Sequence, residues 1–158
     1  MFNAIKKFCR RYPVSRMAVA LLVLSVGSAA IGAKELSVEE LKARLASAST
    51  GERPHLCVEI AEKQFSSANK FYAEGETEKG QAALTDVAVF SESARDNSIQ
   101  SGKHLKQTEI AVRLMTRKLT DLKHRVTHDE QTEVQGTIDR LQRVRDDLLA
   151  AMFHKGDK

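Results

Sequence analysis

The sequence is poor in the residues that build disulfide frameworks, turn-rich folds and aromatic binding surfaces. Its 158 residues include two cysteines, two prolines and no tryptophan, and aromatic residues make up 5% of the chain. So few cysteines exclude a disulfide-stapled fold. The shortage of aromatic side chains leaves few platforms on which nucleic-acid bases stack. The shortage of proline removes the commonest obstacle to long helices.

The first 33 residues have the composition of an export signal. They hold five Lys and Arg residues and no acidic residue, and an apolar run from Met17 to Gly27 follows these cations. Small residues then lead to Ala33. This order is typical of a secretory signal peptide. We predict cleavage after Ala33, with a site after Ala30 as the alternative.

A retained anchor is the other interpretation of the same segment. Its apolar run is slightly short of the about 20 residues that a spanning helix needs, and no second apolar run follows. Cleavage is therefore preferred, which predicts an exported protein, periplasmic or extracellular, with no membrane span after cleavage.

Removing this segment changes the charge of the chain. The whole sequence has a net charge of +4, whereas 20 basic and 21 acidic residues, a net charge of −1, remain after residue 33. The basic character thus belongs to the signal, and nucleic-acid binding is not expected. Cys9 leaves with the signal, so Cys57 is the one remaining thiol and no internal disulfide is predicted.

The remaining residues have the composition of an all-α protein. Alternating strand-like runs are absent, and Ala, Leu, Glu, Lys, Arg and Gln dominate. Ser37 and Glu40 form the Ser-x-x-Glu pattern of a capping box, while Gly75 and Gly102 fall where helices should end. We therefore predict helices at 37–47, 54–73 and 77–101, with two more after residue 105. The chain divides into the signal (1–33), a short helix and linker (34–53), a helical bundle (54–154) and a disordered tail (155–158).

Two apolar series with alternating spacings of three and four residues follow residue 105. They are Leu105, Thr108, Val112, Met115, Leu119, Leu122 and Val126, then Val134, Thr137, Leu141, Val144, Leu148 and Ala151. With a polar turn at 127–131 between them, they predict an antiparallel, heptad-patterned helical hairpin. Further apolar residues widen both stripes, which predicts packing against the preceding helices; they are Ile110, Leu114, Ile138, Leu149 and Met152. A four-helix bundle preceded by a short helix is the simplest closed fold.

Two histidines four residues apart are the first candidate metal ligands. His124 and His128 have Asp121 and Asp129 nearby, and two imidazoles at this spacing can chelate zinc or copper. They straddle the predicted turn, however, and no His-Glu-x-x-His motif supplies a general base. A solvated turn is therefore the preferred interpretation, and no metal site is predicted.

The common cofactor motifs of helical proteins are also missing. A di-iron bundle needs two Glu-x-x-His motifs and covalent haem needs Cys-x-x-Cys-His, neither of which this sequence has. Met115 could ligate a non-covalent haem, but its place on an apolar stripe predicts an ordinary core methionine. No cofactor is predicted.

Cys57 is the one candidate nucleophile. It lies near a helix N-terminus, which lowers a thiol pKa, and His55 is two residues away. Residues two apart on a helix point in different directions, so this pairing is weak. A buried structural cysteine is expected, with reversible dimerisation through Cys57 as the alternative.

The segment 68–94 resembles a single tetratricopeptide hairpin. Phe71, Gly80, Leu84 and Val87 fall near the offsets of that repeat's signature, although Gly80 replaces its usual alanine. No second copy appears at a 34-residue period, and a solenoid needs about three repeats to bury its core. We therefore predict an ordinary helical hairpin.

Charge is distributed unevenly along the chain. Residues 52–98, here called the acidic hairpin, hold nine acidic and five basic residues. Residues 103–126 hold two acidic residues and seven basic ones, here called the basic strip: Lys103, Lys106, Arg113, Arg117, Lys118, Lys123 and Arg125. The strip either meets an anionic partner, such as lipid headgroups, lipopolysaccharide or an acidic protein, or is neutralised by the acidic hairpin within the fold. The small total charge favours neutralisation.

These patterns predict a protein that binds a partner rather than one that catalyses a reaction. No catalytic, cofactor-binding or metal-ligating residue is assigned, and histidines and carboxylates converge on no predicted face. We expect a non-enzymatic protein-interaction or structural module of the cell envelope, with a protein partner or a homo-oligomer as its counterpart. A periplasmic bundle carrying metal or haem is the alternative, and an enzyme has the weakest support.

Overall fold

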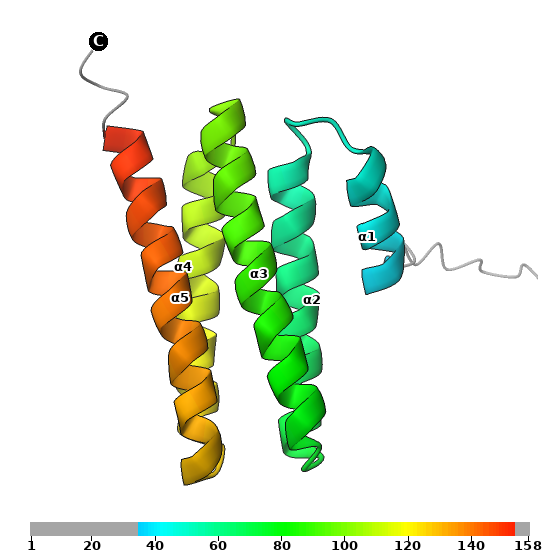
Figure 1. Cartoon of the computed structure of the whole chain (residues 1–158), viewed down its shortest axis with the longest axis vertical. Coiled ribbons are helices and arrows are strands. Elements are labelled where there is room, and N and C mark those ends of the chain that lie inside the picture. The colour runs from blue at the N-terminus through cyan, green and yellow to red at the C-terminus, as the bar shows by residue number, and fades with distance from the viewer. Residues whose placement is uncertain (1–34, 154–158) are drawn as a thin grey trace, which may run out of the picture. The chain divides into compact units, whose positions relative to one another are not determined.

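The structure is a computed structural model and describes residues 35–153. The predicted signal peptide and the predicted tail at 155–158 lie outside the described residues. Between 35 and 153 the chain forms five α-helices and no strand: α1 (Val38–Ser47), α2 (Arg53–Ala73), α3 (Thr77–Ser101), α4 (Leu105–Lys123) and α5 (His128–Phe153) (Figure 1). The predicted all-α helical bundle is confirmed.

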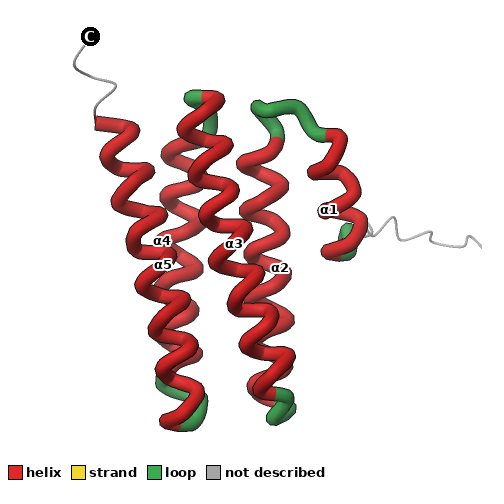
Figure 2. The backbone as a smooth tube through the Cα atoms, in the orientation of Figure 1, coloured by secondary structure: helices red, strands yellow, loops and turns green. Residues whose placement is uncertain are grey.

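Helices α2 to α5 form the bundle as two stacked hairpins. Helix α3 packs against α2 and α5, α5 packs against α4, and α2 contacts α4 to complete the ring. The α1–α2 and α3–α4 connections lie at one end, and the α2–α3 and α4–α5 turns lie at the other (Figure 2). Neighbours within a hairpin are therefore antiparallel, whereas α3 beside α5 and α2 beside α4 run parallel.

The helix ends follow the local sequence signals. At the start of α1, the Ser37 side chain accepts from the Glu40 backbone N–H at 3.2 Å, and the Glu40 carboxylate accepts from the Ser37 N–H at 2.7 Å. This is the predicted capping box. Pro54 stands in the first turn of α2, and Gly102 ends α3 with a left-handed φ of 63°.

The predicted turn between the last two helices is displaced. We expected it at 127–131, but α4 ends at Lys123 and α5 already begins at His128. The Glu130 carboxylate accepts from the Thr127 backbone N–H at 2.9 Å and from its hydroxyl at 2.8 Å. This contact satisfies a free N–H at the helix start, so the polar residues that resembled a turn form the first turn of α5.

The two heptad series line the bundle interior as predicted. Within residues 105–153 the buried members are Thr108, Val112, Met115, Leu119, Leu122, Val134, Thr137, Leu141, Val144 and Leu148. Ile138, one of the residues that widen the stripes, is also buried and belongs to the main core, to which α2 and α3 contribute as well. Leu114 is wrong as a member of that wider face, because it is 45% exposed on the outer side of α4.

Helix α1 is attached through a second, smaller apolar cluster. Leu41 is fully buried against Leu56 and Ile60 of α2, with Phe90 of α3 packed beside them. The Lys42 ammonium lies 3.6 Å from the Asp86 carboxylate. This packing places α1 along the outside of the bundle, at the side opposite α5 (Figure 1).

The seam between α2 and α3 is built from small residues. Ala61 and Ala68 of α2 and Ala83 and Ala88 of α3 are all buried in the main core. Near the turn, the Tyr72 ring lies directly against Gly80, where an added Cβ would be 2.8 Å from a ring carbon. The glycine that departs from the tetratricopeptide pattern thus makes room for the aromatic ring.

Candidate functional site

The two histidines considered as metal ligands lie at the α4–α5 turn. His124 is the C-cap residue of α4, His128 is the first residue of α5, and both are exposed. In the described part of the chain, no group of three or more His, Cys, Asp or Glu side chains is arranged to hold a metal ion. Residues 35–153 also contain no helix that combines the length and apolarity of a membrane span.

The two sulfur-containing candidates are both buried in the structure. Met115 is 1% exposed in the main core, as expected of a packing residue. Cys57 is also 1% exposed, and its thiol is free. Burial raises the pKa of Cys57 to about 11, with a small opposing effect from Arg53. The thiolate that a nucleophile requires is therefore suppressed.

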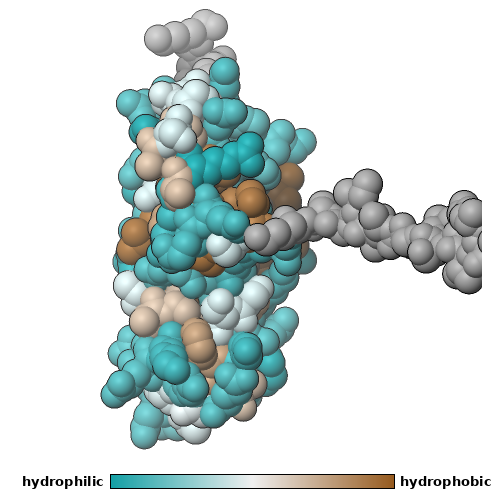
Figure 3. All heavy atoms as spheres, turned by 90° about the vertical axis from the view of Figure 1, so that its right-hand side faces the viewer, coloured by the Kyte–Doolittle hydropathy of each residue, from teal (hydrophilic) through white to brown (hydrophobic). Residues whose placement is uncertain are grey.

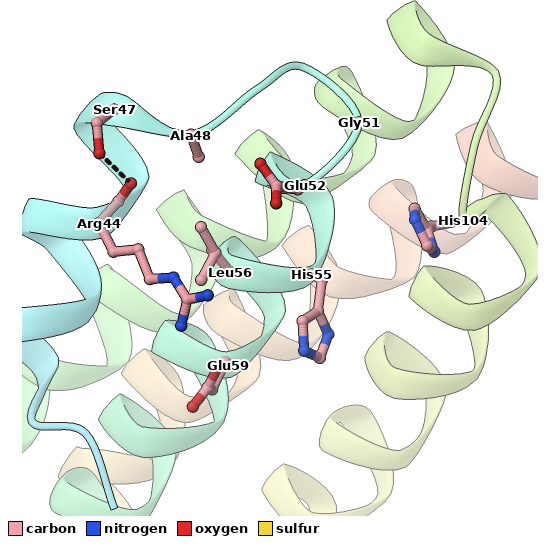
Figure 4. A pocket seen from close by; sticks show the side chains of 9 residues that line it. All are labelled: Arg44, Ser47, Ala48, Gly51, Glu52, His55, Leu56, Glu59 and His104. Atoms are coloured by element: carbon pink, nitrogen blue, oxygen red, sulfur yellow. Dashed lines mark hydrogen bonds between the residues drawn. The ribbon is translucent and has the colours of Figure 1, made fainter.

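A pocket that the sequence did not predict opens where the α1–α2 and α3–α4 connections meet. It has a volume of about 430 Å³. Its charged and imidazole side chains come from α1, from the start of α2 and from the α3–α4 connection (Figure 4). They are Arg44, Glu52, His55, Glu59 and His104. No sequence motif joins these positions, because the two connections bring them together from distant parts of the chain.

The polar groups of this pocket are only partly engaged. Glu52 accepts from the hydroxyl and the backbone N–H of Ser49, at 2.7 and 3.2 Å, and these bonds hold its pKa below the ordinary value. The imidazoles of His55 and His104 make no hydrogen bond or ion pair with any described residue, although the His104 carbonyl accepts from the Thr108 backbone N–H at 2.8 Å. The pocket therefore presents exposed binding groups without a hydrogen-bonded acid–base pair of the kind that proton transfer uses.

His104 has an unusual backbone conformation. Its φ of 62° makes it the one non-glycine residue with positive φ in the described chain. The left-handed region costs an ordinary residue about 1–2 kcal/mol. The strain has a local cause, since Gly102 and His104 both adopt this conformation on either side of Lys103 to reverse the chain from α3 into α4.

The basic strip is the larger candidate surface. Five of its members are exposed, namely Lys103, Lys106, Arg117, Lys118 and Arg125. The Lys123 ammonium donates to Gln135 on α5, and the Arg125 guanidinium donates to Asn69 on α2, both at 2.7 Å. The ion pairs of the described residues include none between this strip and the acidic hairpin.

The acidic hairpin finds its counter-charges elsewhere. Arg140 of α5 donates to both carboxylate oxygens of Glu92 at 2.8 Å, and these bonds lower the pKa of Glu92. Asp86 pairs with Lys42 of α1.

We expected the hairpin to neutralise the strip within the fold; the two do lie side by side, but no ion pair between described residues joins them, so direct pairing does not supply that neutralisation. Helix α4 packs beside α2 and α3, yet no described ion pair joins its cations to their carboxylates. Arg113 pairs with Glu109 of α4 itself, and Lys123 donates to the uncharged Gln135.

Sequence reasoning missed one residue of this basic surface. Arg145 lies on α5, outside the segment in which the basic residues were counted, and its Nε donates to Glu109 of α4 at 2.9 Å. The available signal was its place one residue after Val144 on the core stripe, which puts Arg145 at the edge of the α4–α5 seam.

Comparison with known proteins adds no identification. No protein family model matches the chain, and searches of the curated proteins and of the solved structures find no match.

Proposed function

We propose that the chain is an exported, non-enzymatic helical module that binds an acidic partner protein in the bacterial cell envelope. The observation that carries this proposal is the exposed basic strip on α4. Its cations keep their charge available, because the acidic hairpin pairs with α1 and α5 instead. Unpaired cations gathered on one surface attract an acidic partner and raise its rate of association.

An apolar side chain within the strip supports a protein contact. Leu114 lies between Arg113 and Arg117 in sequence and is 45% exposed. Most of the surface on the α1 side is polar, with apolar side chains visible in small groups (Figure 3). An apolar centre with charged neighbours is the usual anatomy of a protein interface. The strip therefore offers both an anchor and the charges that orient it.

Site-specific photo-crosslinking in the native cells tests this interface. A photoreactive amino acid replaces Leu114, and the matched control replaces Val89 of α3, which is 42% exposed. We expect position 114, and not 89, to form an adduct with a protein that carries an acidic segment. Added salt should reduce the yield of that adduct.

Three results would contradict the proposed contact. They are equal crosslinking from both positions, no adduct from either, and an adduct of twice the mass of the chain. The last would show that α4 meets a second copy of this protein instead of an acidic partner.

Export is tested separately by sequencing the N-terminus of the protein purified from its native cells. We expect the mature chain to begin at Lys34 and to fractionate with the cell envelope or the medium. A protein that keeps Met1 and remains in the cytoplasm would overturn the export part of the proposal.

A further inference from the structure

The outer groove between α4 and α5 gathers arginines from two helices. Arg113 and Arg117 lie four residues apart on α4, and Arg145 comes from α5. With Thr116 and Gln142 they line a cavity of about 320 Å³. We call this cavity the arginine groove.

A buried carboxylate forms ion pairs with two of these arginines and accepts a hydrogen bond from one of them. The side chain of Glu109 is 10% exposed, and its Oε1 lies 2.9 Å from Arg145 Nε and 3.4 Å from Arg113 Nε. The hydrogen bond from Arg145 Nε to Glu109 therefore links α5 to α4, whereas Arg113 lies on the same helix as Glu109 and its buried Nε makes no hydrogen bond. The terminal amino groups of both guanidinium groups make no bond to a described residue. Because the cations are positioned before a ligand arrives, less side-chain entropy is lost on binding.

Arg117 is not used by the fold. It is exposed and makes no hydrogen bond or ion pair with any described residue. Gln142 of α5 is exposed as well, and its amide adds an uncharged donor. The Thr116 hydroxyl is already engaged, since it donates to the Val112 carbonyl at 2.9 Å. The donors left free in the groove are thus the Arg117 guanidinium, the terminal amino groups of Arg113 and Arg145, and one amide.

Charge and geometry select the kind of anion. Three arginines and one glutamate leave a local charge of +2, which a phosphate monoester balances near neutral pH. A planar carboxylate presents its oxygens to one guanidinium fork, whereas a tetrahedral phosphate accepts from donors on several sides. We propose that the arginine groove binds a phosphate group, carried by a soluble phosphate ester or by the headgroup of an anionic lipid.

This proposal goes beyond the proposed protein contact, because a phosphate site needs no partner protein. Crosslinking at Leu114 tests whether a partner protein contacts α4. Phosphate binding by the purified chain tests whether the arginine groove binds an anion. Either result can therefore fail without affecting the other.

Calorimetric titration of the protein purified from its native cells tests the groove. The probes are inorganic phosphate and vesicles of phosphatidic acid, whose headgroup is a phosphate monoester, with neutral phosphatidylcholine vesicles as the blank. We expect saturable binding of at least one anionic probe, weakened about tenfold or more by Arg117→Gln. Lys118→Gln removes the same charge from the adjacent position of α4, outside the groove, and should change the affinity less than about twofold. Circular dichroism checks that both variants remain folded.

The two probes separate the sources of the phosphate. Binding of inorganic phosphate alone assigns the groove to soluble phosphate esters, and binding of the anionic vesicles alone assigns it to lipid headgroups. Absence of saturable binding to both probes would overturn the proposal. Equal weakening by Arg117→Gln and Lys118→Gln would also overturn it, since that result would mean diffuse attraction by the whole strip.

Discussion

The two helices of each hairpin pack against each other, but the kind of packing differs between the two hairpins. The α2–α3 hairpin buries several small residues, and α2 and α3 make the most extensive backbone contact of any helix pair in the described chain. The α4–α5 hairpin is closed by large aliphatic residues such as Leu119 and Leu141, so its helices are held by interdigitating side chains.

Their charges differ in the same way. The acidic hairpin directs carboxylates toward cations on α1 and α5, whereas the basic strip of α4 leaves most of its cations in solvent. The acidic hairpin thus pairs several of its charges within the fold, whereas most cations of the basic strip form no ion pair. A net charge near zero therefore does not require that oppositely charged regions form ion pairs with each other.

The largest expected effect is on the rate at which the Cys57 thiol reacts, and this rate reports how often the α2–α3 hairpin opens. Because burial raises its pKa from 9.0 to about 11, the folded protein should react with iodoacetamide at pH 8 about a hundredfold more slowly than the unfolded chain. Mass spectrometry of timed samples measures the rate. A Ser66→Cys, Cys57→Ser variant places the thiol at an exposed site on the same helix and should react at the unfolded rate. Equal rates for the two folded proteins would contradict the burial of Cys57.

Opposite changes in side-chain size should damage the two seams. Leu141→Ala opens a cavity between α4 and α5 and should lower the free energy of unfolding by about 2–5 kcal/mol. Ala88→Leu overfills the contact of α3 with its neighbours and should cost about 1–3 kcal/mol. Urea denaturation followed by circular dichroism measures both changes. A harmless Ala88→Leu would show that the small-residue seam is not closely packed.

Two glycines inside helices provide a matched pair. Gly136 of α5 has nothing within 4 Å of an added Cβ, so Gly136→Ala should stabilise the protein by up to about 1 kcal/mol. Gly80→Ala should instead destabilise it by about 1–2 kcal/mol, because the new methyl group meets the Tyr72 ring. Adding Tyr72→Leu to Gly80→Ala should restore part of that loss. Thermal unfolding of the four proteins decides the matter, and a stabilising Gly80→Ala would refute the ring contact.

The smallest expected effects on the free energy of unfolding come from removing surface charges of the two hairpins. Arg140→Gln removes the partner of Glu92 and should cost less than about 1 kcal/mol at pH 7, since both side chains are partly exposed. The folded-state pKa of Glu92 is lowered below 4.5, so the bridge stabilises the protein above that pH and is lost as pH falls through the folded value. The deficit of Arg140→Gln should therefore shrink in acid. Lys118→Gln should show no deficit at either pH, and urea unfolding at both measures the difference.

Local and periodic signals in the sequence were enough to predict most of the fold. The capping box at Ser37, the glycine stop at Gly102 and the heptad stripes each depend on residues within one helix, and all three are present. The turn at 127–131 was misplaced because Thr127 and Glu130 resemble loop residues in composition, although together they begin a helix. Composition alone does not distinguish a turn from a cap.

The candidate sites depended on information that a single sequence does not contain. Arg145 meets Glu109 because of the register between α4 and α5, and no spacing along the chain encodes that register. The pocket beside His104 exists because two connections meet at one end of the bundle. Similarly, the failure of the strip to pair with the acidic hairpin follows from how α4 is rotated about its axis.

The contact of Tyr72 with Gly80 has a practical consequence. The chain has no tryptophan and two tyrosines, and Tyr72 is the one that lies in the bundle. Burial, followed by the charges of Glu130 and Glu133 on α5, raises the pKa of its phenol to about 12. Ultraviolet difference spectra and phenol fluorescence of the bundle therefore come from a single ring, placed where the α2–α3 tip meets the start of α5. The absorption and fluorescence of Tyr72 therefore report whether the two hairpins are packed against each other.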